Sequence, residues 1–443
     1  MNKTAPNARF EHDQSRKFFG NSTFEVYMLT VLLGILAIAI IDTLLNRYYG
    51  ADGSLPTFMS SDKPGDIFQS GCSKPLIGEH YFGDFQSEYC RQLRATPYPR
   101  NAPSLYLPGF YVLSSFIAAF TSVASSWLAT TVLSVLFLVT SIKSHLNGKG
   151  HIFASIVLVA TFNPFWQALD RGNFTWLLGI GFIVLGSKPE SRLERSWLFA
   201  IAVSLKMQLA PFALILLYGG TIRDKWRSLA HFAFIFILVN FIIPLLGWRD
   251  FNQFYPNYFK SLRTIKPVEN AYGFRSLIHI ATQLNWSIWF WVFFLLFFIA
   301  VTICLVFINE LDHHLERRNA SEGIVLLTLF ITSFIVLVSP LSFAYSLMVF
   351  LIPIVLIIKM ESGSRLFFKV QLVLVTICVL PNTISLDSFI ARQMPTPVEE
   401  IIRYPSLGNL IPTVLLPSVA ASTIVITCID FGRRQVMKRP ARN

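Results

Sequence analysis

The chain has 443 residues, of which 53% are hydrophobic and only 14% are charged. Such a composition excludes a set of soluble domains, in which about 25% of residues are charged. The formal net charge of +12 lies largely at the borders of apolar segments, where it fits an anionic lipid surface better than a nucleic-acid groove. The sequence therefore predicts an all-α polytopic membrane protein with no nucleic-acid partner.

Apolar runs recur along the whole chain, and an α-helix needs about 20 apolar residues to cross a hydrocarbon core of roughly 30 Å. The first run, from Tyr27 to Leu45, is too long and too far from the N-terminus for a removable signal peptide. We expect it to remain as the first span. The runs predict about twelve spans, at residues 25–45, 105–123, 125–142, 152–168, 174–187, 197–219, 229–247, 286–309, 323–340, 343–359, 367–385 and 410–429.

Lysine and arginine predict the orientation of a single integral membrane domain that covers residues 1–443. Basic residues favour the cytoplasmic side, so we expect residues 221–227 and 312–318 to lie inside. A cytoplasmic N-terminal tail, residues 1–24, and a basic cytoplasmic C-terminal tail, residues 430–443, are expected to lie there as well.

Five other basic residues conflict with twelve complete crossings. They would lie outside if every span crossed: Lys143, Lys149, Lys188, Arg192 and Arg195. One or two of the spans between residues 105 and 219 are therefore expected to be half-helices. Segment 197–219 is the best candidate, because Lys206 and Pro211 interrupt its apolar run. A lysine that snorkels beside a proline kink is the alternative.

Three loops assigned to the outer side are unusually long: residues 46–104, 248–285 and 386–409. Loops of this length are usually functional or disordered. The first two contain many aromatic and apolar residues, which favours short amphipathic helices at the membrane interface. We expect these two loops to cover a cavity as a lid.

The cysteines fit an outward-facing first loop. Cys72 and Cys90 both lie in residues 46–104 and would form a disulfide in an oxidising compartment, the alternative being two unpaired thiols. Metal and cofactor sites are not expected. His313 and His314 lie in a charged inner loop and are typical of solvated surface, and no zinc-ligand spacing occurs.

The chain contains no nucleotide-binding loop, no dinucleotide-binding glycine motif and no serine nucleophile motif. Its remaining candidates for chemistry are polar residues at the ends of spans. They are Asp84, the residues 170–173 ("DRGN"), Lys206 and the cations of the second outer loop.

Several short motifs, in a consistent order, resemble glycosyltransferase family 87. They are "YFGDFQSEY" (81–89), "PYPRNAPSLYLPGFYVL" (97–113), "NPFWQALDRGNFTWLLGIGFIVLG" (163–186), "LFAIAVSLKMQLAPFALILL" (198–217), "ENAYGFRSL" (269–277) and "SPLSFAYSLMVFLIP" (339–353). The resemblance implies a GT-C membrane enzyme that performs an inverting, metal-independent transfer from a polyprenyl-phosphate sugar. It also implies a mannosyltransferase-like activity.

The resemblance assigns the catalytic carboxylate of the first outer loop to Asp84. A carboxylate there would take the proton of the attacking acceptor hydroxyl. Asp66 is the competing candidate, and either residue could instead be an exposed loop carboxylate. The chain departs from the family where Ser339-Pro340 is not followed by the usual tryptophan and histidine. Any role of that histidine with the donor phosphate would pass to Tyr345 or to loop arginines, or the donor chemistry differs.

Cations near the departing phosphate would stabilise its charge in a water-poor site. Arg275 is the preferred ligand, because it follows a turn and precedes an apolar helix start. The other substrate-binding candidates are Arg263, Lys266, Tyr345, Lys206, Asn173 and Arg171. The loop cations are otherwise interfacial anchors, and Asp170 and Arg171 would otherwise form an intramembrane ion pair.

The sequence thus predicts a glycosyltransferase of the inner (plasma) membrane. It would transfer mannose or a related hexose or pentose to a glycolipid or cell-envelope glycan on the outer face. A transporter or lipid flippase is the main alternative, but transporters usually show two related halves, and the loop 46–104 has no counterpart in the second half. A non-catalytic assembly factor is the third possible function.

Overall fold

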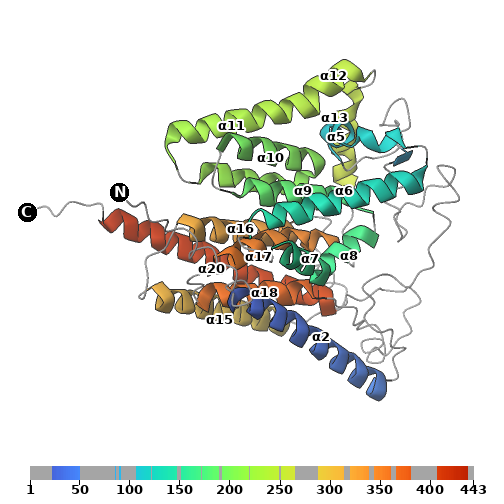
Figure 1. Ribbon diagram of the computed structural model, residues 1–443. Coiled ribbons are helices and arrows are strands. Elements are labelled where there is room, and N and C mark those ends of the chain that lie inside the picture. The colour runs from blue at the N-terminus through green and yellow to red at the C-terminus, as the bar shows by residue number, and fades with distance from the viewer. Residues whose placement is uncertain are drawn as a thin grey trace, which may run out of the picture.

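The computed structural model describes residues 22–49, 85, 89–90, 106–120, 122–146, 151–170, 172–188, 192–218, 220–248, 251–264, 288–313, 320–338, 344–360, 366–380 and 407–437. Within this part of the chain every regular element is a helix, as Figure 1 shows. The expected all-α class is therefore confirmed.

The helices follow the apolar runs of the sequence closely. In chain order they are α2 (Ser22–Tyr49), α5 (Pro108–Leu113), η1 (Ser115–Ala119), α6 (Val123–Lys143), α7 (His151–Thr161), α8 (Asn163–Asp170), α9 (Phe174–Gly186), α10 (Arg192–Leu205), η2 (Met207–Leu217), α11 (Ile222–Ile237), η3 (Leu238–Ile242), α12 (Ile243–Gly247), α13 (Phe251–Thr264), α15 (Ile288–His313), α16 (Ala320–Val338), η4 (Ala344–Phe350), α17 (Leu351–Lys359), α18 (Leu366–Val379) and α20 (Leu407–Met437).

Four helical segments in the described residues are long and apolar enough to cross a membrane. They are Thr23–Ile40, Ser125–Lys143, Ile222–Gly247 and Ile411–Asp430. A fifth crossing is added if α7 and α8, which meet at a bend of 74°, count as one span. The other seven expected runs hold apolar helices of 10–17 residues. By length and composition, the described residues thus hold four or five candidate membrane spans, and the twelve expected crossings are not confirmed.

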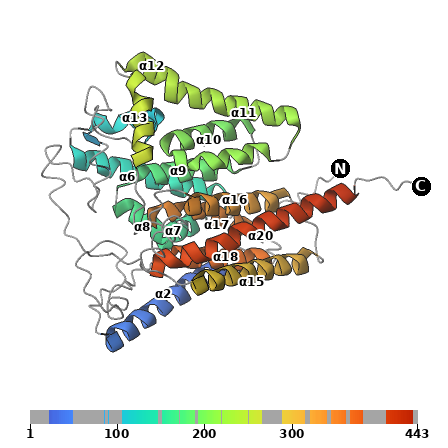
Figure 2. The ribbon, with the colours of Figure 1, turned by 180° about the vertical axis from the view of Figure 1, so that it is seen from behind.

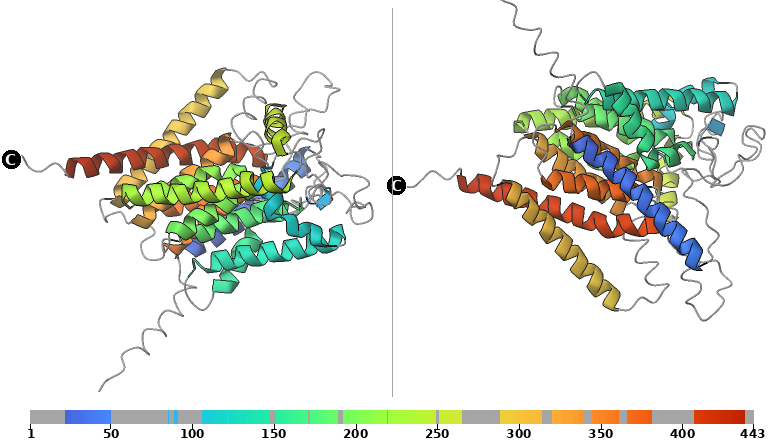
Figure 3. Two further views of the ribbon diagram at one scale, coloured as in Figure 1. Left: turned by 90° about the horizontal axis from the view of Figure 1, so that it is seen from above. Right: turned by 60° about the horizontal axis from the view of Figure 1, so that its bottom comes forward.

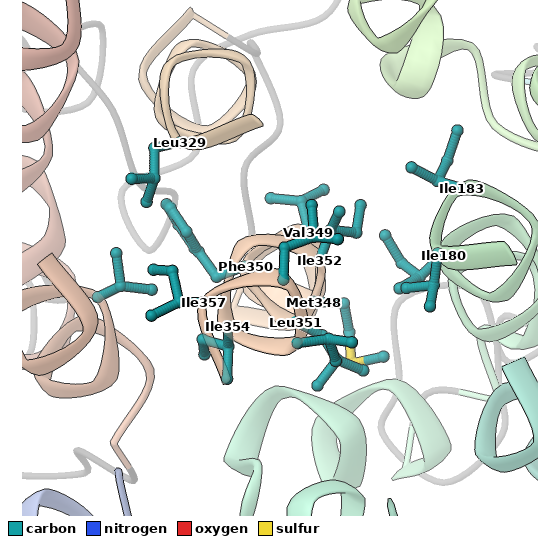
Figure 4. Close-up of a cluster of buried hydrophobic side chains, with 14 of the residues drawn as sticks. Ile180, Ile183, Leu329, Met348, Val349, Phe350, Leu351, Ile352, Ile354 and Ile357 are labelled. Atoms are coloured by element: carbon teal, nitrogen blue, oxygen red, sulfur yellow. The ribbon is translucent and has the colours of Figure 1, made fainter. Parts of the chain in front are cut away.

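The helices form two groups that run side by side (Figures 1 and 2). In the first group α6 packs on α9, α9 on α10, and α10 on α11; in the second, α20 packs on α15, α16 and α18. Helix α17 joins the groups, because it contacts α9 as well as α16 and α18. Figure 4 shows buried side chains of η4 and α17 between Leu329 of α16 on one side and Ile180 and Ile183 of α9 on the other.

The outer surfaces of the bundle are apolar where lipid would contact them. Figure 3 shows α2 and α15 on the outside of the second group. Leu32 of α2 is 61% exposed and Phe307 of α15 is 62% exposed. Large exposed apolar side chains in a row are unusual on soluble proteins, and they agree with a bundle embedded in a bilayer.

The two ends of the bundle are defined by α6 and α9, which run parallel to each other. Val123 begins α6 and lies in one buried cluster with Phe174, which begins α9, and Leu205, which ends α10. We call this end the Lys206 end, since Lys206 follows Leu205. At the opposite end His145, just after α6, donates from Nε2 to the carbonyl of Val184 at 2.6 Å.

Segment 105–123 does not cross the bundle. Its helices α5 and η1 cover Pro108–Ala119, about 18 Å at helical rise, and Phe110 and Ile117 belong to the same cluster at the Lys206 end. The expected crossing here is wrong for that reason. Helix α6 therefore begins at the Lys206 end, and Lys143, its last residue, lies at the opposite end of the bundle.

The cations beyond α9 lie at that opposite end too. Arg195 donates to the carbonyls of Gly186 and Lys188 at 2.9 and 2.7 Å. The guanidinium thereby satisfies carbonyls that the end of α9 leaves without partners. Segment 105–123 enters and leaves at the Lys206 end. The basic residues after α6 and α9 therefore lie at the opposite end, and they no longer conflict with complete crossings of the other segments.

The predicted interruption of segment 197–219 is confirmed. Helix α10 ends at Leu205, Lys206 is extended with φ −147° and ψ 102°, and η2 continues as a 3₁₀-helix. A Cβ on Gly179 would lie 2.7 Å from Leu209 Cδ1 and 3.9 Å from the Ala202 carbonyl oxygen. Because residues on both sides of Lys206 meet the same glycine, the chain turns back there.

A second interruption was not predicted. The 74° bend between α7 and α8 lies at Phe162, before Asn163 and Pro164. Proline disfavours helical geometry in the residue before it and starts a new helix readily. The Asn-Pro pair was therefore an available signal for this bend.

Candidate functional site at the Lys206 end

Lys206 lies at the turn between α10 and η2, where its ammonium group meets two aromatic residues. Its Nζ is 3.5 Å from the hydroxyl oxygen of Tyr106 and 4.5 Å from the centroid of the Tyr106 ring. It is also 5.5 Å from the ring of Trp176, which is completely buried. Both distances to the rings are within the range of cation–π attraction. The charge is therefore held in a defined place at the end of an apolar bundle.

The backbone at this break is hydrogen bonded although the helix is interrupted. The Lys206 N–H donates to the Ala202 carbonyl, and the Leu209 N–H donates to the Lys206 carbonyl, each at 2.9 Å. Irregular backbone is tolerated at membrane depth only where protein or a cavity satisfies it. These two bonds allow the chain to turn at Lys206.

The aromatic wall continues from Tyr106 toward the first outer loop. Tyr106 stacks on Phe110 at 4.3 Å between ring centroids, and Phe110 is 6.1 Å from Phe174. Phe85 packs edge-on against Phe174 at 5.8 Å and is 1% exposed. The residue that follows Asp84 in the chain is therefore anchored in the cluster beside Lys206.

Tyr89 and Cys90 anchor the same loop a few residues later. The Tyr89 hydroxyl donates to the Phe120 carbonyl at 2.9 Å, and both residues are buried in the cluster. Cys90 is disulfide-bonded, whereas the other three cysteines of the described residues, Cys304, Cys378 and Cys428, are free. The expected partner, Cys72, lies outside the described residues.

Helix α13 of the second outer loop covers the Lys206 end, as Figures 1 and 2 show by its position across the ends of the other helices. Phe254 and Tyr258 pack on Leu107, and the Tyr258 hydroxyl donates to Met207 Sδ at 3.0 Å. Burial raises the pKa of Tyr258 above its ordinary value, so this hydroxyl keeps its proton. The amphipathic helix predicted in this loop is thus present and lies beside the break.

Asn173 precedes α9 and is buried at the same end of the bundle. Its Oδ1 accepts a hydrogen bond from the Thr175 hydroxyl at 2.7 Å, and its N–H donates to the Ala168 carbonyl at 2.8 Å. Gly172, just before it, has φ 65°, a value that suits glycine. The turn between α8 and α9 therefore holds Asn173 three residues from Trp176.

The structure describes the side chains of only some of the predicted site residues. Lys206 and Asn173 lie at the same end. Arg263 lies in α13 and Tyr345 in η4, with their side chains outside the description. Asp84, Asp66, Arg171, Lys266 and Arg275 lie outside the described residues.

Two of the aromatic neighbours were not predicted as site residues. Tyr106 is in the quoted motif at 97–113 and Trp176 in that at 163–186, yet nothing in those motifs pairs either residue with Lys206. A lysine in an apolar run requires partners, and that requirement was the available signal. Within the residues that the structure covers, no three His, Cys, Asp or Glu side chains gather as metal ligands.

The fold and this end of the bundle define a class: an all-helical membrane protein with a half-buried cation at a broken helix, covered by a helix of a long loop. The sequence model of glycosyltransferase family 87 matches residues 105–340, more than half of the chain. The chain belongs to glycosyltransferase family 87 and is a glycosyltransferase. No curated protein and no solved structure matches the chain.

The matched region contains Tyr106, Asn173, Trp176 and Lys206, but not Asp84 or Tyr345. Membership of the family favours the glycosyltransferase over the transporter and the assembly factor. The resemblance seen in the sequence is thereby confirmed.

Proposed function

We propose that this protein is a GT-C enzyme that transfers a sugar from a polyprenyl-phosphate donor to a glycolipid or cell-envelope glycan on the outer face of the inner (plasma) membrane. Mannose, or a related hexose or pentose, is the sugar. The single observation that carries the proposal is the placement of Lys206 between Tyr106 and Trp176 at a helix break.

Lys206 is the proposed ligand of the donor phosphate. A charged side chain inside a membrane bundle is costly and usually functional, and a lysine binds phosphate as a point charge. A polyprenyl-phosphate has its tail in lipid and its phosphate at the interface. A cation at the end of an apolar bundle is located where such a headgroup would lie.

Asp84 is the proposed base. Phe85 is buried against Phe174, and consecutive Cα atoms are about 3.8 Å apart. Chain connectivity therefore supports a carboxylate close to the cluster that also contains Leu205, the neighbour of Lys206. A base within hydrogen-bond reach of the acceptor hydroxyl would complete the transfer.

The cations of the second outer loop complete the proposed donor site. Helix α13 contacts Leu107 and Met207 and contains Arg263, and Lys266 and Arg275 follow it in the chain. We assign Arg275 to the donor phosphate, with Arg263 and Lys266 in support. Tyr345, Asn173 and Arg171 remain proposed contacts to the substrate.

The proposed topology keeps twelve crossings in a changed arrangement. Segment 105–123 stays on the outer side, and α10 and η2 cross separately with Lys206 at the outer turn. Lys143, Lys188 and both termini then lie in the cytoplasm, as the distribution of basic residues favours. The loops 46–104 and 248–285 lie outside.

The test uses purified protein in nanodiscs with labelled sugars, supplied either as polyprenyl-phosphate sugars or as nucleotide sugars, and an extract of envelope glycolipids as acceptor. We expect transfer from a polyprenyl-phosphate sugar alone. Transfer from nucleotide sugars only would contradict the proposed donor. Transport of intact lipid without transfer would favour the flippase.

A further inference from the structure

We propose that Asn240 is a positioning residue that holds Tyr106 and Lys206 in the relative geometry needed for the donor phosphate. The proposal rests on the function proposed above. Asn240 forms its hydrogen bonds with Gly109, Ser204, Phe236 and Tyr255, and it would act on Tyr106 and Lys206 through the backbone segments next to them.

The side chain of Asn240 is completely buried and uses all of its main hydrogen-bonding groups. Its Oδ1 accepts from the Gly109 N–H at 2.9 Å. Its Nδ2 donates to the Ser204 hydroxyl oxygen at 2.8 Å and to the Phe236 carbonyl at 2.9 Å. One amide thus joins α5, α10 and the end of α11.

The two site residues lie just outside the two helices joined by this amide, Tyr106 before α5 and Lys206 after α10. Gly109 lies three residues after Tyr106, and Ser204 lies two residues before Lys206. In sequence Asn240 is 131 residues from Gly109 and 36 from Ser204. Its hydrogen bonds therefore fix a distance that neither local segment fixes alone.

Gly109 is needed for this close approach. A Cβ at that position would lie 2.6 Å from Asn240 Oδ1 and 2.9 Å from both Ser204 Cβ and Val239 Cγ1. Any side chain there would push α5 away from α10. The absence of a side chain at 109 and the amide at 240 are thus two parts of one junction.

The backbone around Asn240 is specialised as well. Asn240 lies in η3, a single π-helical turn between α11 and α12, and its carbonyl accepts from the Tyr255 hydroxyl at 3.1 Å. Such turns occur frequently at functional sites. Through Tyr255 the junction also contacts α13, the helix that covers the Lys206 end.

Stability alone is a weak explanation for this junction. Hydrogen bonds between membrane helices contribute modestly on average, and apolar packing can replace a buried polar pair with little loss. Orientation of a cation is a stricter requirement, because a displacement of about 1 Å can reduce a rate by about 100-fold.

The main test compares Asn240→Leu with Gln371→Leu in nanodiscs. Gln371 is a matched control, because its buried amide donates to Ser422 at 3.2 Å between α18 and α20, away from the Lys206 end. We expect both variants to melt at lower temperature, and kcat/KM for the polyprenyl-phosphate sugar to fall by about 10- to 100-fold in Asn240→Leu only. Equal kcat/KM in the two variants would overturn the inference.

Asn240→Asp adds a readout that a purely structural role would not change. A protonated carboxyl can donate to Ser204 and accept from Gly109, whereas an ionised carboxylate cannot donate. Burial raises the pKa of such a carboxyl, so activity should recover as the pH is lowered, relative to the wild type. A wild-type pH profile would contradict the proposal. If Asn240→Leu fails to fold, this variant decides.

A structure of Asn240→Leu separates this inference from the proposed function. We expect cryo-electron microscopy to show Lys206 Nζ displaced from the Tyr106 ring, whichever sugar donor the enzyme uses. An unmoved pair overturns the inference even if the wild type transfers sugar. If the wild type transfers no sugar but Lys206 and Tyr106 separate in Asn240→Leu, only the proposed function is contradicted.

Discussion

Replacing Lys206 with methionine removes the charge and keeps an unbranched apolar side chain of similar length. The wild-type ammonium lies 4.5 and 5.5 Å from two ring centroids, and cation–π contacts contribute about 0.5–2 kcal/mol depending on solvation. The methionine avoids the cost of desolvating a charge and preserves packing of the stem. We expect the free energy of unfolding to change by less than about 2 kcal/mol.

The effect on catalysis should be larger than the effect on folding. A hydrogen bond between a charged group and a phosphate contributes about 1.5–3 kcal/mol. At about 1.4 kcal/mol for each factor of ten, this predicts a loss of about 10- to 150-fold in kcat/KM. The KM for the donor should rise because the phosphate is charged in the ground state, and kcat should fall because the departing phosphate gains further negative charge in the transition state.

The assay is transfer from a labelled polyprenyl-phosphate sugar in nanodiscs, after melting temperature and expression have been matched to the wild type. Lys143→Met is the control, because Lys143 is an exposed lysine at the opposite end of the bundle. It should transfer sugar like the wild type. Donor KM and turnover within twofold of wild type in folded Lys206→Met would refute the role of this lysine.

Three other predictions concern different parts of the chain. Asp84→Asn should reduce turnover by about 10²–10⁴-fold while donor binding survives, and near-normal turnover would exclude this residue as the base. Peptide mapping without reduction should find Cys90 linked to Cys72, and a different partner would contradict the predicted loop. Burial lowers the pKa of His145, which follows α6, to about 4; because the unfolded chain then binds the proton more readily, stability should fall as the pH drops from about 6.5 to 4. His145→Gln should flatten this dependence of melting temperature on pH, and an unchanged slope would contradict the assignment.

The positions of the helices could be predicted because an apolar run long enough to enter a bilayer must satisfy its backbone internally. Whether a run crosses was harder to predict. Segment 105–123 is as apolar as its neighbours, but its first helix is held by a bond from Gly109 to Asn240, 131 residues away. No local pattern encodes that contact. The only available indication that a segment does not cross was the set of basic residues that would lie on the outer side if every segment crossed.

Lys206 could be predicted as a site residue, since a lysine and a proline in one apolar run are locally conspicuous. Its neighbours could not, because Tyr106 lies 100 residues earlier and aromatic residues are common throughout this chain. The role of Asn240 was still harder to predict from the sequence. A single amide in an apolar helix resembles an ordinary buried polar residue until the fold shows that it contacts two other elements.

The helix break and the Asn240 junction solve two parts of one physical problem. The turn at Lys206 places a cation at the end of the apolar bundle, and local hydrogen bonds satisfy its backbone. A turn alone leaves the direction of a long flexible side chain undetermined. The junction supplies the second constraint, because it holds the segment that carries Tyr106 against α10 two residues before the turn. Local sequence therefore places the charge, and contacts across the fold determine what it faces.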